Sequence, residues 1–225
     1  MRTIGRHGAS LLCMNSIDRR IVVSSVLVGL FWPLFILADA LARQNATAAP
    51  KPPVYVSDFL IDVVPPQSGT QKPEDNPQKL AGRLVELMAS TLVAALQKGG
   101  YTATRLHAGD TRPDDGVQIR GLFAEVDSEN HWRRAVIRSA TDSGKMEALV
   151  AVANLAKPDQ ALYEIAHLPG NEDKPGAVIT LSPYVPLTKF DLSKDADENA
   201  FKGIAQRVVK DLTDLLNRNP YAVPQ

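Results

Sequence analysis

The stretch Pro77–Lys98 constrains the fold more than any other part of the sequence, because its apolar residues recur at spacings of three and four. This period is typical of an amphipathic helix, and it gathers side chains such as Leu84 and Met88 into one wide stripe that must be buried. Asn76 is a favourable N-cap for this helix, and Gly99-Gly100 can end it in a left-handed conformation. The other apolar runs after residue 53 favour strands, except for one helix near the C-terminus. We therefore expect the helix to cover a sheet.

Six runs of β-branched, aromatic or alternating apolar residues are predicted to be strands, over residues 54–64, 101–107, 117–127, 146–156, 161–168 and 177–181. A helix is predicted over about 196–217, with Asp195 and Glu198 spaced like a capping box. The turn Lys157-Pro158-Asp159 predicts a hairpin between the fourth and fifth strands, and Gly121 within the third indicates a bulge or a close backbone approach. The predicted fold is a two-layer α+β domain, in which two helices pack on a mostly antiparallel sheet of about five to six strands.

Residues 1–42 have the pattern of a signal peptide. Arg19-Arg20 precede the apolar run Ile21–Leu37, and Ala40-Leu41-Ala42 places small residues where a signal peptidase reads, so we expect cleavage after Ala42. The apolar run is long for a signal core, and an uncleaved membrane anchor is the alternative. Residues 43–53 are predicted to be a disordered leader, 54–217 a single α/β domain and 218–225 a tail. The protein is expected to be periplasmic or exported, or else anchored in the inner membrane through Ile21–Leu37 alone.

Charge and cysteine content exclude several classes of function. Lys+Arg and Asp+Glu total 25 each; four of the basic and two of the acidic residues precede residue 43, so the rest of the chain has a net charge of −2. A near-neutral domain offers no electrostatic footprint for a polyanion, and no nucleic-acid partner is expected. The single cysteine, Cys13, lies before the apolar run. It therefore cannot be a lipoprotein cysteine, and thiolate chemistry is excluded from everything after it.

Signals for catalysis are sparse. Asp58 and Asp62 are four residues apart in the first predicted strand, which would place both carboxylates on one face for acid–base work or for holding a divalent cation. No third ligand has a recognisable spacing, which favours ordinary polar residues at a strand end. Three histidines follow residue 42 without any metal-binding spacing: His107, His131 and His167. No serine lies in a G-x-S-x-G motif and no glycine-rich phosphate loop is present. We expect no cofactor, no metal site and no catalytic residue.

The densest group of functional side chains comprises His131, Trp132, Arg133, Arg134 and Arg138. Arginine beside tryptophan can clamp an anionic group or stack on the surface of a partner. Three carboxylates nearby could instead neutralise these charges and make the segment a hairpin tip laced with surface ion pairs: Asp127, Glu129 and Asp142. If the group binds anything, a protein contact is favoured over a small ligand.

Several short motifs resemble those of a bacterial family of proteins, the domain-of-unknown-function family 4410. They are VYVSDF at Val54–Phe59, the helix end at Leu96–Tyr101, GLF at Gly121–Phe123 leading through Asn130 to Arg133-Arg134, and KPGA at Lys174–Ala177. The resemblance extends from about Val54 to Leu216. The sequence departs from the family where a glycine-rich run usually follows the arginines, and it lacks the lipobox cysteine of many relatives. The resemblance implies an envelope location and a small α/β domain; it implies no substrate.

The predicted function is that of an exported, non-enzymatic binding or assembly factor in the periplasm, which contacts another envelope protein through its sheet edges and the segment His131–Arg134. One alternative is a periplasmic hydrolytic enzyme, which requires Asp58 or Asp62 within hydrogen-bond reach of a histidine in a cleft. Another is a small-ligand-binding domain, which requires a pocket along the Leu84–Leu92 face of the first helix.

Overall fold

Helix α2 (Pro77–Lys98) forms with the bounds that the sequence predicts. The side chain of Asn76 caps it by accepting a hydrogen bond of 2.9 Å from the backbone N–H of Gln78. Gly99 closes the last turn, and Gly100 takes the left-handed conformation, with φ 78°. The computed structural model describes residues 51–64, 76–156 and 160–218. The predicted signal peptide, leader residues 43–50, the turn at 157–159 and tail residues 219–225 lie outside the described residues.

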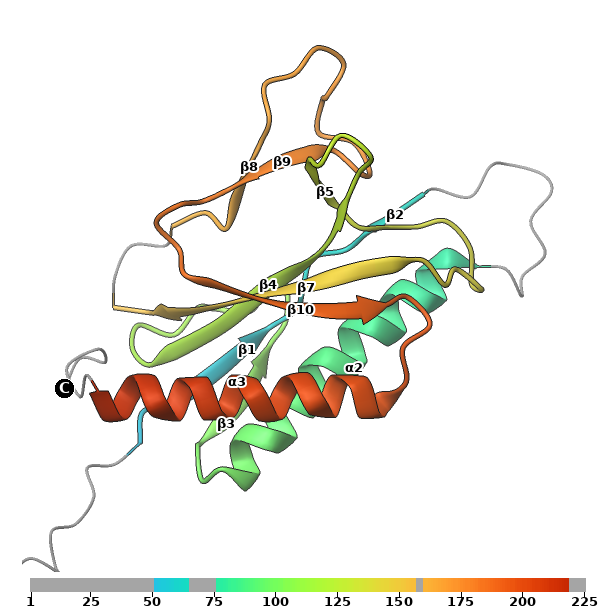
Figure 1. Ribbon diagram of the computed structural model, residues 1–225. Helices are drawn as coiled ribbons and strands as arrows, with labels where there is room; N and C mark the ends of the chain where they lie inside the picture. The colour runs from blue at the N-terminus through green and yellow to red at the C-terminus, as the bar shows by residue number, and fades with distance from the viewer. Residues whose placement is uncertain (1–50, 65–75, 157–159, 219–225) are drawn as a thin grey trace, which may run out of the picture. The chain divides into compact units, whose positions relative to one another are not determined.

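The described residues form an eight-stranded mixed sheet in the order β10-β7-β4-β5-β9-β8, with β1 beside the first half of β4 and β3 beyond β1 (Figure 1). Its strands are β1 (Val54–Ser57), β3 (Ala103–Leu106), β4 (Val117–Val126), β5 (Trp132–Arg134), β7 (Lys145–Asn154), β8 (Tyr163–Ile165), β9 (Val178–Leu181) and β10 (Leu187–Ser193). The short strands β2 (Asp62–Val63) and β6 (Val136–Ile137) pair separately and in parallel. The predicted α+β class is confirmed. The sheet is larger than predicted, and it is mixed because β1 runs parallel to β3 and β4.

Two pairings differ from the sequence prediction. The expected hairpin between the fourth and fifth predicted strands is wrong, because β7 pairs with β4 and β10, whereas β8 pairs with β9. Strand β10 itself was not predicted. Its sequence LTKFDLS follows Pro186 and is half polar: Phe190 and Leu192 are buried, whereas Thr188, Lys189 and Asp191 are exposed along this edge strand.

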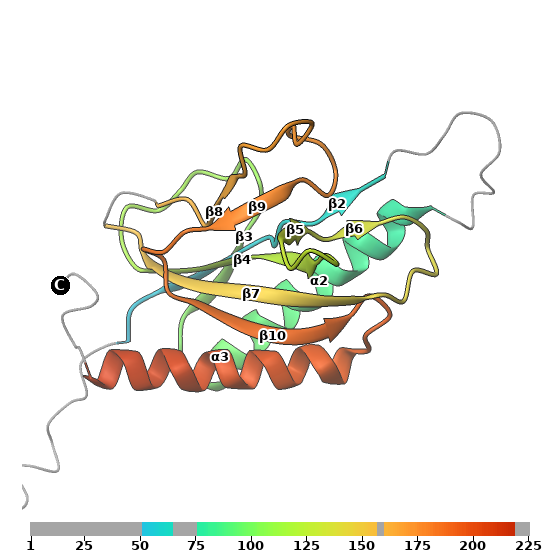
Figure 2. The same cartoon turned by 45° about the horizontal axis from the view of Figure 1, so that its top comes forward.

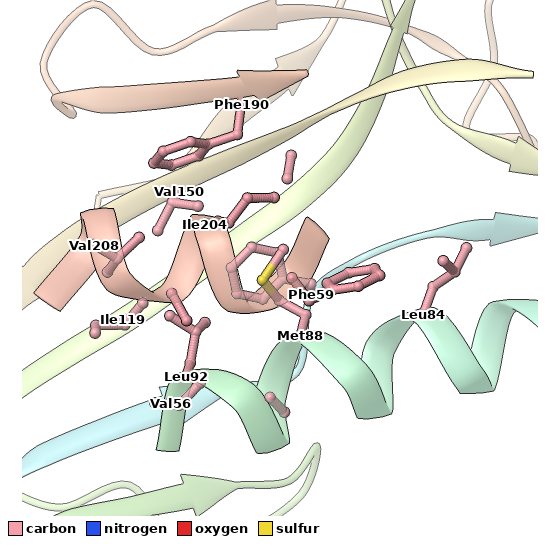
Figure 3. Close-up of a cluster of buried hydrophobic side chains, with 14 of the residues drawn as sticks. Val56, Phe59, Leu84, Met88, Leu92, Ile119, Val150, Phe190, Ile204 and Val208 are labelled. Carbon is pink, nitrogen blue, oxygen red and sulfur yellow. The ribbon is translucent and has the colours of Figure 1, made fainter. Parts of the chain in front are cut away.

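The main core lies between the sheet and the two helices. Figure 3 shows Leu84, Met88 and Leu92 of α2 pointing at strand residues such as Val56 and Ile119, all of them fully buried. A second, smaller cluster lies on the opposite face of the sheet and contains Leu122, Leu149, Ala151, Leu162, Ile179 and Val185. Strands β4 and β7 therefore carry apolar side chains on both faces, which explains their nearly continuous apolar sequences.

The predicted strand over residues 54–64 is interrupted at Phe59 and Leu60. Leu60 forms an isolated bridge to Leu122, donating to the carbonyl of Gly121 at 3.1 Å and accepting from the N–H of Phe123 at 2.9 Å. The Phe59 ring lies so close to Gly121 that a Cβ there would be 2.8 Å from Phe59 Cζ, and closer still to the carbonyl oxygen of Leu149. The close backbone approach predicted at Gly121 is confirmed.

Helix α3 (Glu198–Arg218) packs beside α2 on the same face of the sheet (Figure 1). Its cap differs from the predicted capping box. The side chain of Asp197, not Asp195, accepts from the backbone N–H of Ala200 at 3.1 Å. Asp195 instead accepts from the hydroxyl of Ser193, because the helix starts two residues later than predicted.

Among the described residues, α2 is long and apolar enough to cross a membrane by length and composition. A core helix of a globular domain has the same properties. Leu84, Met88 and Leu92 of α2 are fully buried, so its apolar stripe is used in packing.

Candidate functional site

The turn between β4 and β5 is built around the carboxylate of Asp127. This carboxylate accepts hydrogen bonds from the backbone N–H groups of Glu129 and His131, at 2.9 and 2.8 Å, and from Arg133 Nε at 2.7 Å. Asn130 completes the turn in the left-handed region, with φ 65°. The backbone N–H of His131 is the main reason why the pKa of Asp127 is lowered to about 2, and Arg133 adds to the effect. The turn therefore holds a fixed negative charge, with Arg133 bound to it.

Arg134 is the most buried arginine of the predicted binding group, with 13% of its side chain exposed. Its guanidinium contacts Asp62 at 2.9 Å and Asp173 at 2.8 Å, and it donates to the hydroxyl of Tyr163 at 3.4 Å and to the carbonyl of Lys174 at 2.9 Å. Burial acts to lower the pKa of Arg134, but these hydrogen bonds and charges outweigh it and raise the pKa. Its guanidinium is engaged within the fold, so Arg134 has a structural role.

The turn Lys174–Ala177 completes this network. The N–H of Gly176 donates to Asp62 Oδ2 at 2.8 Å, and its carbonyl accepts from Arg133 Nη1 at 3.3 Å. Gly176 has φ 78°, and a Cβ there would lie 2.8 Å from Val136 Cγ2. Both the conformation and the space require glycine at this turn.

A polar cavity of about 420 Å³ lies beside these arginines. It is lined by Val64, Glu125, Asp127, Arg133, Arg134, Val136, Arg138, Pro175 and Gly176. The fold thus brings together the three arginines that the sequence suggested. Arg138 is exposed, and its backbone N–H donates to Asp142 at 3.2 Å. Within the described part of the chain its guanidinium has no bonded partner, and 40% of the Arg133 side chain is exposed.

A buried ion-pair network adjoins the cavity at Glu125 and Val136, and sequence reasoning missed it. The ammonium of Lys194 lies 2.6 Å from Glu125 Oε1 and 3.2 Å from Asp142 Oδ2, and it donates to the carbonyl of Val136 at 2.8 Å. Lys194 is 2% exposed. Burial acts to raise the pKa of Asp142, but the N–H of Arg138 and the charge of Lys194 outweigh it and lower the pKa. The local sequence carries no signal for this role.

The other two residues of the predicted group do not line the cavity. Trp132 is half-buried against the second apolar cluster, with Lys189 Nζ 4.2 Å from the centre of its ring. His131 is half-exposed, and its Nδ1 lies 3.6 Å from Asp127 and 3.5 Å from Glu129. The predicted group is therefore divided: an accessible part (His131, Arg133 and Arg138) and a structural part (Trp132 and Arg134).

Asp58 and Asp62 bind different partners and do not form a carboxylate pair. Asp58 contacts Arg105 Nε at 2.7 Å and His107 Nδ1 at 3.4 Å, and Arg105 also pairs with Glu86. The His107 side chain is 58% exposed, and no hydroxyl is hydrogen-bonded to its ring among the described residues. The described part of the chain also contains no group of three or more His, Cys, Asp or Glu side chains that could hold a metal ion.

The Leu84–Leu92 face of α2 gives the small-ligand alternative no support. Leu84, Met88 and Leu92 are fully buried against the sheet and α3. A cavity of about 550 Å³ does adjoin α2, but it lies on the outer side of this helix, in the groove between α2 and α3. Ser90 of α2 and Val209 of α3 are among the residues that line it.

Comparison with known proteins gives a family and no activity. No curated protein matches the chain. A solved structure described as "Crystal structure of uncharacterized protein" is similar at 8% sequence identity and a TM-score of 0.24, covering 73% of this chain and 90% of that one; a likeness this weak carries no argument. The family described as "Domain of unknown function (DUF4410)" matches residues 54–188, so α3 lies outside the match, which is shorter than the predicted resemblance to about Leu216. The match covers more than half of the chain and includes all the motifs of the resemblance, and the chain therefore belongs to the DUF4410 family.

Proposed function

We propose that this protein is an exported, non-enzymatic binding or assembly factor of the cell envelope, which contacts an acidic segment of another envelope protein. The observation that carries the proposal is the pair of accessible arginines at the polar cavity. Arg133 is half-exposed, and the Arg138 guanidinium has no bonded partner within the described residues. Guanidinium groups bind carboxylates in a planar, bidentate manner, so two of them at one cavity suit a carboxylate-bearing segment.

The fixed charges around the cavity support a protein partner over a small anion. Glu125 and Asp127 also line it, and each is already paired, with Lys194 and Arg133 respectively. A small anion would meet both carboxylates at close range. A peptide segment can place its acidic side chain at Arg138 and leave the paired groups undisturbed.

The export half of the proposal comes from the sequence, in the positive flank Arg19-Arg20, the apolar run Ile21–Leu37 and the cleavage signal before Arg43. It is tested by fractionating cells that express the full chain with a C-terminal tag and sequencing the N-terminus of the product. We expect a periplasmic product that begins at Arg43. An intact chain in the membrane pellet would place the same domain on an anchor, and an intact chain in the cytoplasm would refute export.

The contact itself is tested by placing a photocrosslinking residue at His131 in cells that express the full chain. We expect a crosslinked partner that is lost in the variant carrying Arg133→Ala and Arg138→Ala. The control is Lys210→Ala, on the exposed side of α3, which should leave the crosslink unchanged. A crosslink pattern that is the same in all three proteins would show that the arginines make no contact.

A hydrolytic enzyme is the second candidate, because His107 Nδ1 lies 3.4 Å from Asp58. Catalysis would require the other ring nitrogen to act on a water or a hydroxyl of a substrate. The test is hydrolysis of ester, phosphoester and peptide substrates by the purified protein. Activity that is lost in His107→Gln would support this candidate, and equal rates in the two proteins would remove it.

A further inference from the structure

Three strands lie at edges of the described part of the sheet, and β10 is the longest of them, with seven residues. Figure 2 shows β10 at the margin of the sheet beside α3. It pairs with β7 on one side, and among the described residues no strand pairs with its other side. Thr188, Lys189 and Asp191 are exposed along it. A free edge of this length is a template for another strand.

The register shows which backbone groups of β10 are free. The N–H of Lys194 donates to the carbonyl of Gly144 at 3.0 Å, in the same register that pairs β10 with β7. Hydrogen-bonded and non-bonded pairs alternate in antiparallel sheets, so Phe190 bonds to β7. The odd-numbered residues therefore point their N–H and C=O groups outward: Leu187, Lys189, Asp191 and Ser193.

The side chains at this edge are complementary to a second copy of the same strand. A two-fold axis through Phe190 would align two β10 strands in antiparallel fashion, with Lys189 of each copy opposite Asp191 of the other. The outward backbone groups of these residues would then form the hydrogen-bonded pairs of the new ladder. Opposite charges at directly facing positions stabilise strand pairing, and the symmetry makes the contact twice.

Within one chain Asp191 lacks such a partner. It lies opposite Glu147 of β7, which is a like-charge pair, and neither carboxylate has an ion pair within the described residues. Like charges at facing positions disfavour strand pairing. Lys189 of a second copy would supply the missing positive charge, and in the single chain the Lys189 ammonium makes only an exposed contact with the Trp132 ring.

We infer that the protein forms a symmetric dimer by antiparallel pairing of β10 with β10 about Phe190, which joins the two sheets into one. This dimer is independent of the envelope partner proposed above. The pairing needs no change of fold, because the strand is already extended and its outward groups are already aligned. Thr188, which points to the helix side of the sheet, is exposed, so α3 leaves this edge open.

The test is sedimentation velocity on the protein recovered from expressing cells, over about 1 μM to about 1 mM, the range expected for a small interface. We expect a monomer–dimer equilibrium. Lys189→Asp or Asp191→Lys alone would place like charges at both contacts and should weaken the dimer about tenfold or more. The double variant restores opposite charges and should restore the dimer. In the Asp191→Lys variant, the introduced lysine faces Glu147 with an opposite charge, so the melting temperature of this variant should not fall. A weaker dimer with an unchanged melting temperature would show that the variant has lost strand pairing and not its fold.

A covalent trap locates the interface independently. In a Cys13→Ser background, the substitutions Lys189→Cys and Asp191→Cys would bring two thiols opposite each other across the axis, at the spacing of a hydrogen-bonded strand pair, which suits a disulfide. Oxidation should give a covalent dimer, whereas the control variant with Lys202→Cys and Gln206→Cys, at exposed positions of α3, should not. A protein that stays monomeric at all concentrations would overturn the inference. A dimer that is insensitive to the charge reversals and is not trapped would also overturn it, because it would use another surface.

Discussion

Gly121→Ala should be among the most damaging single substitutions in this protein. A Cβ at Gly121 would lie 2.8 Å from Phe59 Cζ and closer still to Phe59 Cε1 and the Leu149 carbonyl oxygen, whereas relaxed contacts of this kind need about 3.3 Å or more. Relief requires the Phe59 ring to leave its place or β4 to separate from β7, the longest pairing in the sheet. Overpacking of a core costs typically 1–3 kcal/mol, and loss of a ladder hydrogen bond adds about 1 kcal/mol. We expect about 3 kcal/mol in total, or a fall of roughly 6–12 °C in melting temperature.

Thermal and urea denaturation followed by circular dichroism would measure this effect. Gly82→Ala is the matched control, because Gly82 lies within α2 and a Cβ there meets nothing within 4 Å. It should stabilise the protein by about 0.5–1 kcal/mol. Phe59→Ala should cost about 3–5 kcal/mol alone and less in the Gly121→Ala background, because it removes one of the two clashes. If Gly121→Ala unfolds within about 0.5 kcal/mol of the parent protein, the close approach of Phe59 to this strand is wrong.

Three further predictions concern the polar network and the β8–β9 loop. Lys194→Met should lower the free energy of unfolding by about 3–5 kcal/mol, because it leaves the carboxylates of Glu125 and Asp142 without their partner. The exposed Lys210→Met should change the free energy of unfolding by less than about 0.5 kcal/mol, and equal effects of the two substitutions in urea denaturation would contradict the burial argument. The folded pKa of Asp127, about 2, lies below the usual value of about 3.9, so its charge stabilises the fold above about pH 4 and this contribution is lost as the pH falls toward 2. The melting temperature of Asp127→Asn should therefore be below that of the parent at pH 7 and converge with it near pH 2; a gap that does not depend on pH would refute this. Asn171→Ala removes three hydrogen bonds that tie the base of the loop and should speed its amide hydrogen exchange, and unchanged exchange would show that the loop is held elsewhere.

Much of the fold could be predicted from local patterns. The 3.6-residue period and the capping residues define α2 within the stretch Pro77–Lys98, since a helix satisfies its backbone within its own segment. The long apolar strands β4 and β7 were predicted to within one or two residues, because they are buried on both faces. Gly121 was predicted to mark a bulge or a close backbone approach, because glycine within a strand otherwise only weakens it, and the structure shows the close approach.

Short or half-polar strands were not predictable in the same way. Strands β5, β6 and β10 are short or half polar, and each pairs with a strand distant in the sequence: β5 with β9, β6 with β2 and β10 with β7. The expected hairpin of β7 with β8 failed for the same reason: a turn signal shows that the chain reverses and does not show which strand it then pairs with. The start of α3 was misplaced because Asp195 and Asp197 are both suitable caps by composition.

The sequence by itself determined the family, the α+β class, both helices and the three arginines of the candidate site, because these depend on composition and on spacing within one segment. Only the tertiary structure decided that Arg134 is an internal ion-pair partner while Arg133 and Arg138 stay accessible, that Asp58 and Asp62 part to different arginines, and that Lys194 is buried between two carboxylates. The physical reason is that the role of a charged side chain depends on which opposite charge the fold brings within a few ångströms and on how much water remains around it. Both are set by contacts between segments far apart in the chain, which no local pattern records.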